Sequence, residues 1–577
     1  MYTTHLNASI LAAVFATAAV AAIAAPAGSS HYLIEAATAA EAHERVERVH
    51  GTVERDLEII HGVAASLDAA QAAELRAMTG VRVYADRSLS TAGTKAAAAK
   101  VATASASTPL ADGTGLSTRI KLYQTNYPME VGADTLQQAG ITGKGVTIAI
   151  LDTGLWQANN QNYGTRVKQT IDVTNGGSGN VDDDPYGHGT HIASIAAGGA
   201  QNNAGGYLAI APEANLVIIR AFDDTGAGRY ADVIAGLNWI LANQKKLKVN
   251  VLNLSFGAPP QSDYWDDPIN QAVMALWKAG IVVVTAAGNE GPTPMTIDVP
   301  GNVPYVITAG ALTDNNTPYD YSDDALASFS SSGPTFEGFV KPELVAPGGH
   351  MVGSQKYTSY LANIDPGSLV QGDNLFTMSG TSQAAAVTTG VVALMLQSDP
   401  TLTPDNVKCR LMASARPAIT PSGTLAYSVF QQGAGLINAV DAIGSSATGC
   451  ANVGLDIAAD LAGTAHFGGP ANQDASGNYY LMDLGASAWG TPLTGDGFTW
   501  SKGFTWSKGF TWSKGFTWSK GFTWSKGYTW SKGFTWSKGY TWSKGYTWSK
   551  ALPWWDTTGV PTVATTPTSI VTWVPNQ

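Results

Sequence analysis

The sequence predicts an α/β fold in which helices cover both faces of a doubly wound, mostly parallel sheet. From about residue 120 onward, short and nearly continuous apolar segments recur, which is typical of parallel strands buried on both faces. Helical segments alternate with them, and this alternation favours a parallel sheet. The clearest apolar segments are VTIAIL (146–151), NLVIIRAF (215–222), VNVLNLSF (249–256), IVVVTAAG (281–288) and YVITAGAL (305–312), and the clearest helical ones are 229–246 and 268–280.

A smaller unit precedes this region, and its pattern predicts a separate α+β domain over 31–88. Two segments have the spacing of amphipathic helices, and strand-like segments lie before, between and after them. The expected strands are 31–37, pieces within 52–66, and 81–86, and the expected helices are 39–51 and 69–80.

The first 25 residues resemble an export signal. Residues 10–25 form an apolar run of small side chains, which is short for a membrane span of ~20 residues. Ala22-Ile23-Ala24 offers a small-residue cleavage pattern. Because the preceding residues carry no Lys or Arg, the alternatives are an uncleaved anchor and a flexible Ala-rich start. We expect a secreted, extracellular protein, with cell-surface association left open.

The remaining chain divides by composition. An Ala-, Ser-, Thr- and Gly-rich segment follows the small domain and cannot bury a core, so it predicts a linker. The expected divisions are a signal peptide (1–25), the small domain (31–88), the linker (89–118), the α/β domain (119–446), a connecting region (447–496), a repeat (497–550) and a tail (551–577).

The repeat consists of nine copies of Gly-[Phe/Tyr]-Thr-Trp-Ser-Lys. Because its period is even, a strand would keep the aromatic residues and Lys on one face, which favours a β-like arrangement. Three interpretations stay open: contact with polysaccharide or the cell envelope, self-association, and a low-complexity spacer.

Charge separates this repeat from the folded body. The formal net charge is -11, yet outside 497–550 the chain has 24 Lys and Arg against 44 Asp and Glu. An acidic body argues against nucleic acid as a partner.

The chain has two cysteines, Cys409 and Cys450. In an exported protein they could pair, which would close a loop of about 42 residues and contribute ~4 kcal/mol in the chain-entropy model. The alternative is a pair of buried free thiols.

Three loops carry the residue types of a nucleophilic hydrolase. Asp152 follows a buried strand in ILDTG, His188 lies in a Gly-rich turn before a helix, and Ser382 lies at the start of an apolar helix. Each alone has an ordinary structural explanation as a turn residue, a structural histidine or a helix cap. Together they supply what the chemistry needs, since a serine hydroxyl requires an imidazole to take its proton and the imidazole requires a carboxylate to orient it.

The sequences of these segments resemble the motifs of the subtilisin-like serine protease family, or subtilases. The resemblance covers roughly 120–445 with every motif in family order. The motifs are ILDTG (150–154), GHGTHIAS (187–194), IAP (210–212), NLSFG (253–257), AAGNEG (286–291), KPELVAPG (341–348) and SGTSQAA (379–385). The resemblance implies a secreted serine endopeptidase that is synthesised as a self-processing zymogen and cleaves protein or peptide substrates.

The resemblance also implies a role for each matching residue. Asp152 would orient His188, His188 would be the general base and Ser382 the nucleophile. Asn289 would donate to the oxyanion together with the Ser382 backbone N–H.

Further roles follow from the same resemblance. Ser255, Phe256 and Gly257 would pair with the substrate backbone and wall the primary specificity pocket. His191 would be structural, and residues 31–88 would be an inhibitory propeptide that occupies the cleft until it is removed.

The chain departs from the family pattern after the nucleophile, where the usual Met-Ala-[Ser/Thr]-Pro-His-Val is replaced by a run beginning Gln383-Ala384. We expect a change in packing and no loss of activity. The chemistry requires no cofactor, and the family's structural calcium is left open. The acidic run Asp182–Asp184 is interpreted as a solvated turn in preference to a calcium site.

Two other classes of function compete with an active endopeptidase. One is a surface-binding protein in which the tail is the functional part. The other is a non-catalytic relative, which the presence of Asp152, His188, Ser382 and Asn289 makes the weaker alternative.

Overall fold

The computed structural model describes residues 30–91, 125–158, 163–174, 182–370, 374–421, 425–473 and 479–481. The expected signal peptide (1–25), repeat (497–550) and tail (551–577) lie outside the described residues. So do most of the expected linker (89–118) and the end of the connecting region.

The small N-terminal domain has the predicted mixture of strands and helices. A four-stranded antiparallel sheet in the order β2-β3-β1-β4 carries both helices. Its elements are β1 (Ser30–Glu35), α1 (Ala39–Arg48), β2 (Thr52–Leu57), the 3-10 helix η1 (Glu58–Ile60), β3 (Gly62–Leu67), α2 (Ala69–Ala77) and β4 (Arg82–Ala85). Thr38 and Asp68 cap the two helices through their side chains, which satisfies backbone N–H groups that would otherwise lack partners.

The larger domain is built on the predicted parallel sheet. Its strand order is β14-β13-β12-β10-β6-β8-β7, with β15 also paired to β13, and only β14 runs antiparallel to its neighbour. The strands are β6 (Thr147–Asp152), β7 (Val167–Asp172), β8 (Asn215–Arg220), β10 (Val249–Leu254), β12 (Val282–Ala286), β13 (Ile307–Thr313), β14 (Ala325–Leu326) and β15 (Leu344–Pro347). Since every residue of β6, β12 and β13 is buried, their continuous apolar runs are explained.

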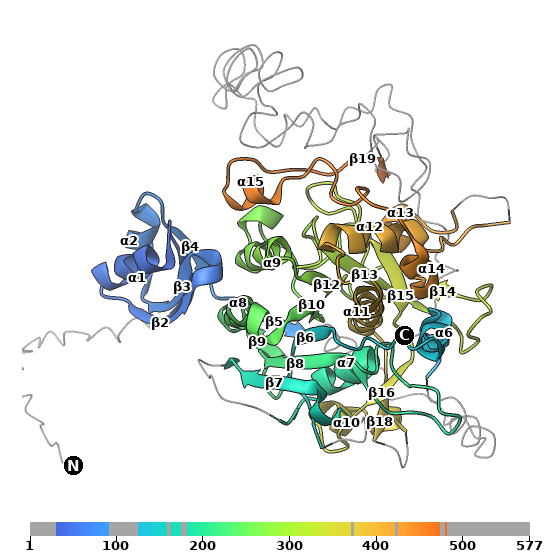
Figure 1. Ribbon diagram of the computed structural model, residues 1–577. Helices are drawn as coiled ribbons and strands as arrows, with labels where there is room; N and C mark the ends of the chain where they lie inside the picture. The colour runs from blue at the N-terminus through green and yellow to red at the C-terminus, as the bar shows by residue number, and fades with distance from the viewer. Residues whose placement is uncertain are drawn as a thin grey trace, which may run out of the picture.

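Helices cover both faces of this sheet, as expected (Figure 1). Helices α8 (Tyr230–Leu247) and α9 (Pro268–Lys278) pack on one face, and α11 (Thr381–Ser398) packs on the other together with α7 (His188–Ala197). Because α11 crosses the centre of the sheet, 16 of its 18 residues are buried. The prediction of a doubly wound α/β domain is therefore confirmed.

Smaller elements complete the described chain. They are α5 (Tyr127–Glu130), α6 (Ala133–Gln138), η3 (Gly164–Arg166), η5 (Tyr264–Asp266), β16 (Met351–Ser354), α10 (Tyr360–Ile364), η6 (Pro366–Ser368), β17 (Leu369–Val370), β18 (Leu375–Met378), α12 (Pro404–Ser414), α13 (Val429–Gln432), α14 (Ala439–Gly444), α15 (Ile457–Leu461), β19 (Ala471–Gln473) and β20 (Tyr479–Leu481). In the described part of the chain, no helix is both long and apolar enough to cross a membrane.

The connecting region packs onto the larger domain as far as it is described. Helix α15 contacts α9, and the Asp460 carboxylate accepts hydrogen bonds from the buried hydroxyls of Tyr264 at 2.5 Å and Tyr305 at 3.1 Å. Cys409 and Cys450 form a disulfide with Cα atoms 5.2 Å apart, so the alternative of free thiols is excluded. The disulfide ties the chain after α14 back to α12.

One strand joins the two domains. Strand β5 (Ser88–Thr91) lies between β9 (Ala227–Arg229) and β11 (Phe256–Gly257) in a three-stranded antiparallel sheet. Leu89 is buried in the core of the larger domain. An ordered strand therefore continues to Thr91, where composition alone indicated a linker from residue 89.

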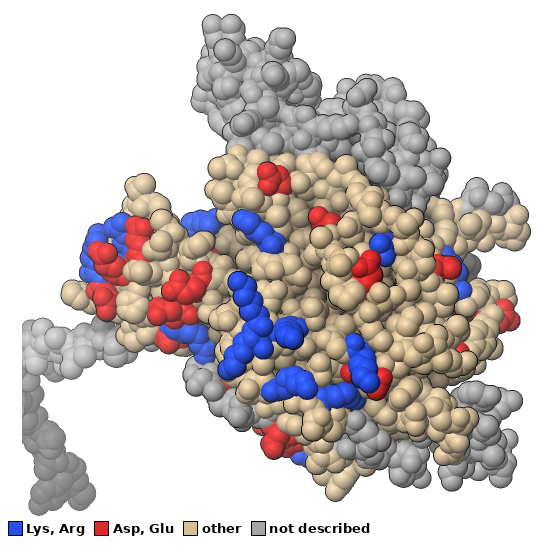
Figure 2. All heavy atoms as spheres, in the orientation of Figure 1, with Lys and Arg blue, Asp and Glu red and all other residues tan. Residues whose placement is uncertain are grey.

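The small domain also contacts the larger domain directly, because its helix η1 packs against α8 and α9. Ile59 donates its backbone N–H to Asn238 Oδ1 at 2.9 Å, and Arg87 pairs with the buried Asp267 at 2.9 Å. Figure 2 shows acidic and basic side chains interspersed over the N-terminal domain, whereas most of the visible face of the larger domain carries no charge. The two domains thus share apolar and ionic contacts.

Candidate active site

Asp152 and His188 form a buried pair at the carboxyl end of the sheet. Asp152 is the last residue of β6, and His188 is the first residue of α7. The imidazole Nδ1 lies 2.8 Å from one carboxylate oxygen of Asp152 and 2.9 Å from the other. Both side chains are almost completely excluded from solvent, so the carboxylate fixes the orientation and the tautomer of the ring.

Gly187 and the carboxylate of Asp184 fix the start of α7. Gly187 has φ 106°, and a Cβ there would lie 2.0 Å from Gln355 Nε2, so no larger residue fits immediately before His188. The buried Asp184 accepts hydrogen bonds from Gly187 N and Thr190 N, both at 2.8 Å. These contacts satisfy backbone donors at the helix start and hold His188 in place.

This role of Asp184 corrects part of the sequence interpretation. Of the run Asp182–Asp184, Asp184 is completely buried and Asp183 pairs with Lys356 at 2.7 Å, so the turn is structural and is not simply solvated. Within the described ranges, no group of three or more His, Cys, Asp and Glu side chains is arranged to hold a metal ion.

Ser382 is the second residue of α11 and is buried. Its hydroxyl donates to the backbone oxygen of Ser255 at 3.1 Å, and the Ser255 hydroxyl donates to the backbone oxygen of Ser382 at 3.0 Å. Ser382 is thereby held against the strand segment that the sequence predicted to bind substrate.

The starts of α7 and α11 face one another. The side chain of Gln383, next to Ser382, lies 3.4 Å from Nδ1 of His191, one helical turn after His188. The Nε2 atom of His188 is buried and has no hydrogen-bond partner among the described residues. An imidazole that acts as a general base needs one such nitrogen without a partner.

His191 differs from His188 in having structural partners on both ring nitrogens. Its Nε2 lies 3.0 Å from the Phe376 backbone oxygen, and burial lowers its pKa to about 4. It is therefore neutral near pH 7, as a structural histidine would be. Gln383, the first residue that departs from the family pattern, fills the space beside this ring, so the departure is a change in packing.

Asn289, in the segment between β12 and β13, contacts the first residue of α11. Its side-chain oxygen accepts hydrogen bonds from Thr381 N and Thr381 Oγ1, both at 3.0 Å. Because this oxygen accepts from Thr381, the orientation of the amide is fixed, and its NH₂ group points away from Thr381 as the donor end of the side chain. A fixed amide donor near a serine hydroxyl has the composition of an oxyanion site.

The predicted substrate-binding residues already hold an extended segment. Phe256 pairs with Thr91 and Gly257 with Ser90 in antiparallel register, and on the other side Leu89 pairs with Gly228. This arrangement is strand addition to two exposed edges, a common mode of peptide recognition. The end of the small domain thus pairs with the segment to which the sequence analysis assigned substrate binding.

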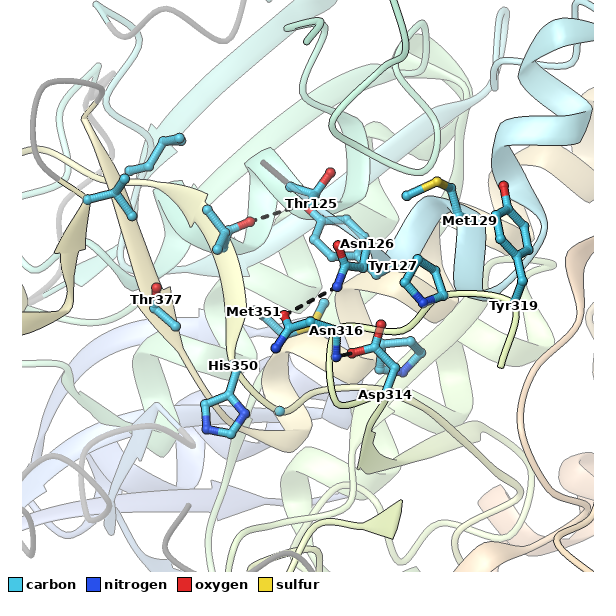
Figure 3. Close-up of a pocket in the computed structure, with 16 residues that line it drawn as sticks. Thr125, Asn126, Tyr127, Met129, Asp314, Asn316, Tyr319, His350, Met351 and Thr377 are labelled. Carbon is cyan, nitrogen blue, oxygen red and sulfur yellow. Dashed lines mark hydrogen bonds between the residues drawn. The ribbon is translucent and has the colours of Figure 1, made fainter. Parts of the chain in front are cut away.

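A separate hollow of about 880 Å³ lies elsewhere in the larger domain. Figure 3 shows Asn126, Asn316 and Asp314 linked by hydrogen bonds on one side of it, with His350 nearby. None of Asp152, His188, Ser382 and Asn289 lines this cavity. It is therefore distinct from the candidate catalytic centre.

Known proteins resemble this chain across the larger domain. The serine protease AprX of Bacillus subtilis is 41% identical over 273 residues, which span 46% of this chain and 60% of AprX. Subtilisin DY of Bacillus licheniformis is 32% identical over 310 residues, which span 53% of this chain and 94% of that protein. The match with AprX thus covers less than two thirds of that relative.

A solved structure extends the comparison to the fold. Fervidolysin from Fervidobacterium pennivorans, described as a keratinolytic enzyme related to subtilisin, superposes with a TM-score of 0.53 at 20% identity. The superposition covers 73% of this chain and 61% of fervidolysin. At that identity the likeness establishes the fold and nothing beyond it. Residues 143–435 match the subtilase family over half of the chain, and this protein therefore belongs to the subtilase family of serine-type endopeptidases.

Proposed function

We propose that this protein hydrolyses peptide bonds through an acyl-enzyme formed on Ser382, with Asp152 and His188 as its catalytic partners. The observation that carries the proposal is the buried Asp152–His188 pair, whose distal nitrogen lacks a partner among the described residues. A buried, oriented imidazole with one available nitrogen is suited to proton transfer with a nearby hydroxyl.

In the proposed reaction, His188 Nε2 takes the proton of Ser382 as its Oγ attacks the substrate carbonyl carbon. The negative charge on the carbonyl oxygen is stabilised by the Asn289 amide and the Ser382 backbone N–H. His188 then gives the proton to the leaving amine, which breaks the peptide bond and leaves an ester on Ser382. Water, activated by the same imidazole, hydrolyses the ester and restores the hydroxyl. No cofactor takes part in these steps.

Digestion of an unfolded protein tests this function. We expect the purified chain to degrade denatured casein and Ser382→Ala to lose this activity, because the variant keeps the fold but lacks the attacking oxygen. The assay is a fluorescence-labelled casein digest with matched protein concentrations. Equal digestion by both proteins would refute the assignment of Ser382.

We further propose that residues 31–88 with strand β5 act as an inhibitory propeptide. Support comes from β5, which occupies the edges of β9 and β11, and from the docking of η1 on α8 and α9. Strand β5 ends at Thr91 opposite Phe256, and the backbone oxygen of the preceding Ser255 lies 3.1 Å from Ser382 Oγ. We therefore propose that the bond that Ser382 attacks lies shortly after Thr91.

N-terminal sequencing of the matured protein checks this register. We expect the active protein to begin shortly after Thr91, because β5 ends beside the segment that contacts Ser382. The Ser382→Ala variant should retain residues 31–91 bound to the larger domain. A mature N-terminus before Ser88, or removal of the domain in Ser382→Ala without any added protease, would contradict self-processing at this site.

Other parts of the proposal concern residues outside those described. We propose export through residues 1–25, an extracellular site of action on protein substrates, and attachment to the cell envelope or to polysaccharide as one role for the 497–550 repeat. The aromatic and cationic composition of the repeat supports a binding role. Structural calcium remains compatible with the family and is assigned to no residue here.

A further inference from the structure

The arginine immediately before strand β5 lies in a pocket of the larger domain. The Arg87 guanidinium donates to Asp267 Oδ2 at 2.9 Å and to the Tyr230 hydroxyl, and its Cζ atom lies 4.5 Å from the centre of the Tyr230 ring. Tyr230 and Asp267 are each only 1% exposed, and neither lies in a motif that carries the family resemblance. A carboxylate, a hydroxyl and an aromatic face thus meet one guanidinium, which is a combination that suits arginine.

Contacts within the larger domain hold both side chains of this pocket. Tyr230 is the first residue of α8, and Asp267 is the N-cap of α9. The Asp267 Oδ1 atom accepts from Ile269 N at 2.9 Å, and its Oδ2 atom accepts from the Tyr230 hydroxyl at 3.1 Å. Because none of these contacts involves Arg87, we expect the pocket to keep its shape when the small domain is removed.

Arg87 reaches the pocket through backbone pairing of the strand in the cleft. Its backbone oxygen accepts from Tyr230 N at 2.9 Å, and the next residue, Ser88, pairs with Arg229 in the β5–β9 ladder. Alternate residues of a strand face the same side. Accordingly, Arg87 and Leu89 face the larger domain, whereas Ser88 between them is exposed. An extended substrate on the same edge would place one side chain where Arg87 lies, two residues before the position of Leu89.

The pocket needs a cation when Arg87 is absent. Burial raises the pKa of Asp267, and the Arg87 guanidinium opposes this rise. The other hydrogen-bond partners of the Asp267 carboxylate in the described part of the chain are uncharged; they are the Tyr230 hydroxyl and the backbone N–H groups of Ile269 and Asn270. A buried carboxylate without a cationic partner is costly, so the emptied pocket favours a basic side chain over a neutral or acidic one.

We propose that Tyr230 and Asp267 form a substrate subsite that prefers arginine, at the position that Arg87 occupies in the precursor. This inference rests on the proposed function and describes its substrates: extended segments with an arginine two residues before an apolar side chain, upstream of the cleaved bond. Lysine supplies the charge but lacks the planar fork that reaches both Asp267 and Tyr230, so it should bind less well than arginine.

Internally quenched peptides of the form x-Ser-Leu-Ser-Thr, each continued by the same cleavable segment, test the preference. They differ only in x, which is Arg, Lys, Gln or Glu and corresponds to Arg87. The matured enzyme should cleave the Arg peptide with a kcat/KM about 10- to 100-fold above that of the Gln peptide, with the Glu peptide poorest. Equal values for Arg and Gln would overturn the subsite, while the cleavage itself upheld the proposed function. No cleavage of any of these peptides, nor of casein, would instead refute that function.

Asp267→Asn isolates the charge, because asparagine keeps the size of the side chain and is also a good helix N-cap. We expect the advantage of the Arg peptide over the Gln peptide to disappear, while kcat/KM for the Gln peptide stays within a few-fold of the wild-type value. An equal loss on all four peptides would show that Asp267 acts only through the start of α9, and this result would also overturn the proposal.

Asp266→Asn is the matched control. Asp266 is the neighbouring acid, its side chain is 43% exposed, and its carboxylate accepts from Arg82 and Tyr84 of β4, both at 3.1 Å. This acid therefore meets the body of the small domain, whereas Asp267 meets the residue before β5, and the variant should keep the full preference for Arg. If Asp266→Asn removed the preference as strongly as Asp267→Asn, the general negative charge of this surface would account for it and the assignment to Asp267 would be wrong.

Discussion

Asp152→Asn is expected to lower kcat at neutral pH by about 10⁴-fold, a magnitude known for other proteases with this set of residues. The carboxylate accepts from His188 Nδ1 at 2.8 and 2.9 Å, which keeps the proton on Nδ1 and leaves Nε2 unprotonated. An Asn side chain can instead donate its NH₂ to Nδ1. The proton then moves to Nε2, and the ring can no longer take a proton from Ser382.

The measurement is kcat and KM of Asp152→Asn on a peptide p-nitroanilide at neutral pH. KM should change little, because Asp152 is buried and its carboxylate is paired with the His188 imidazole. In a Ser382→Ala background the same change should have no further effect, since residues that act as a unit are not additive. A fall of less than tenfold, or an additive loss in the double variant, would contradict the assigned role.

The central sheet could be predicted because its strands are buried on both faces. β6, β8, β10, β12 and β13 appear in the sequence as continuous apolar runs. β7 was missed because it lies at the edge of the sheet, with a sequence, VKQTID, in which only two residues are buried. Edge strands that face water lack the apolar signal on which the prediction depended.

Strand β5 shows a different limit. Its sequence, SLST, is short and polar, so composition assigned most of it to a linker. It is ordered because it pairs with β9 and β11, which are more than a hundred residues away in the chain. No local pattern contains such a long-range pairing. Only the resemblance to a family with propeptides suggested that this end of the small domain lies in the cleft.

The residues of the candidate site also divide into those that the sequence reveals and those that only the structure reveals. Asp152, His188, Ser382 and Asn289 lie in motifs that could be read from the sequence, and the structure brings their elements together at one edge of the sheet. The role of Asp184 could not be predicted, because it depends on the backbone N–H groups of Gly187 and Thr190 that its carboxylate meets in the folded chain.

A cluster of three buried charged side chains, Lys341, Glu343 and Lys408, leads to the second prediction, a large loss of stability. Lys341 and Lys408 both pair with Glu343 Oε1 at 2.8 Å, and all three side chains are almost completely buried. The other oxygen of Glu343 accepts from Thr308 N at 2.8 Å. Glu343 directly precedes β15 and belongs to the KPELVAPG motif.

Glu343→Gln is expected to destabilise the larger domain by about 3–5 kcal/mol, the usual cost of removing one partner from a buried ion pair. The amide keeps the size of the side chain and removes the charge that compensates two ammonium groups. Burial already lowers the pKa of Lys341 to about 7, and the attraction of Glu343 opposes this shift. Without the carboxylate, the pKa of Lys341 should fall further.

The dependence of this loss on pH distinguishes electrostatics from packing. A lysine whose folded pKa is depressed binds fewer protons in the folded state than in the unfolded state, so stability rises with pH from about 7 to the unfolded pKa near 10.4. The part of the Glu343→Gln deficit that comes from Lys341 should therefore be largest below pH 7, where Lys341 is protonated in the folded wild type, and should shrink as the pH rises through about 7, because Lys341 is then neutral in both folded proteins. Thermal unfolding in the Ser382→Ala background, which prevents self-digestion, measures this deficit.

Asp224→Asn is the control for this measurement. The Asp224 carboxylate pairs with Arg220 but is 66% exposed, so the substitution should change the free energy of unfolding by less than about 1 kcal/mol. A deficit for Glu343→Gln that is equally small, or that does not vary with pH, would show that the two lysines do not depend on this carboxylate.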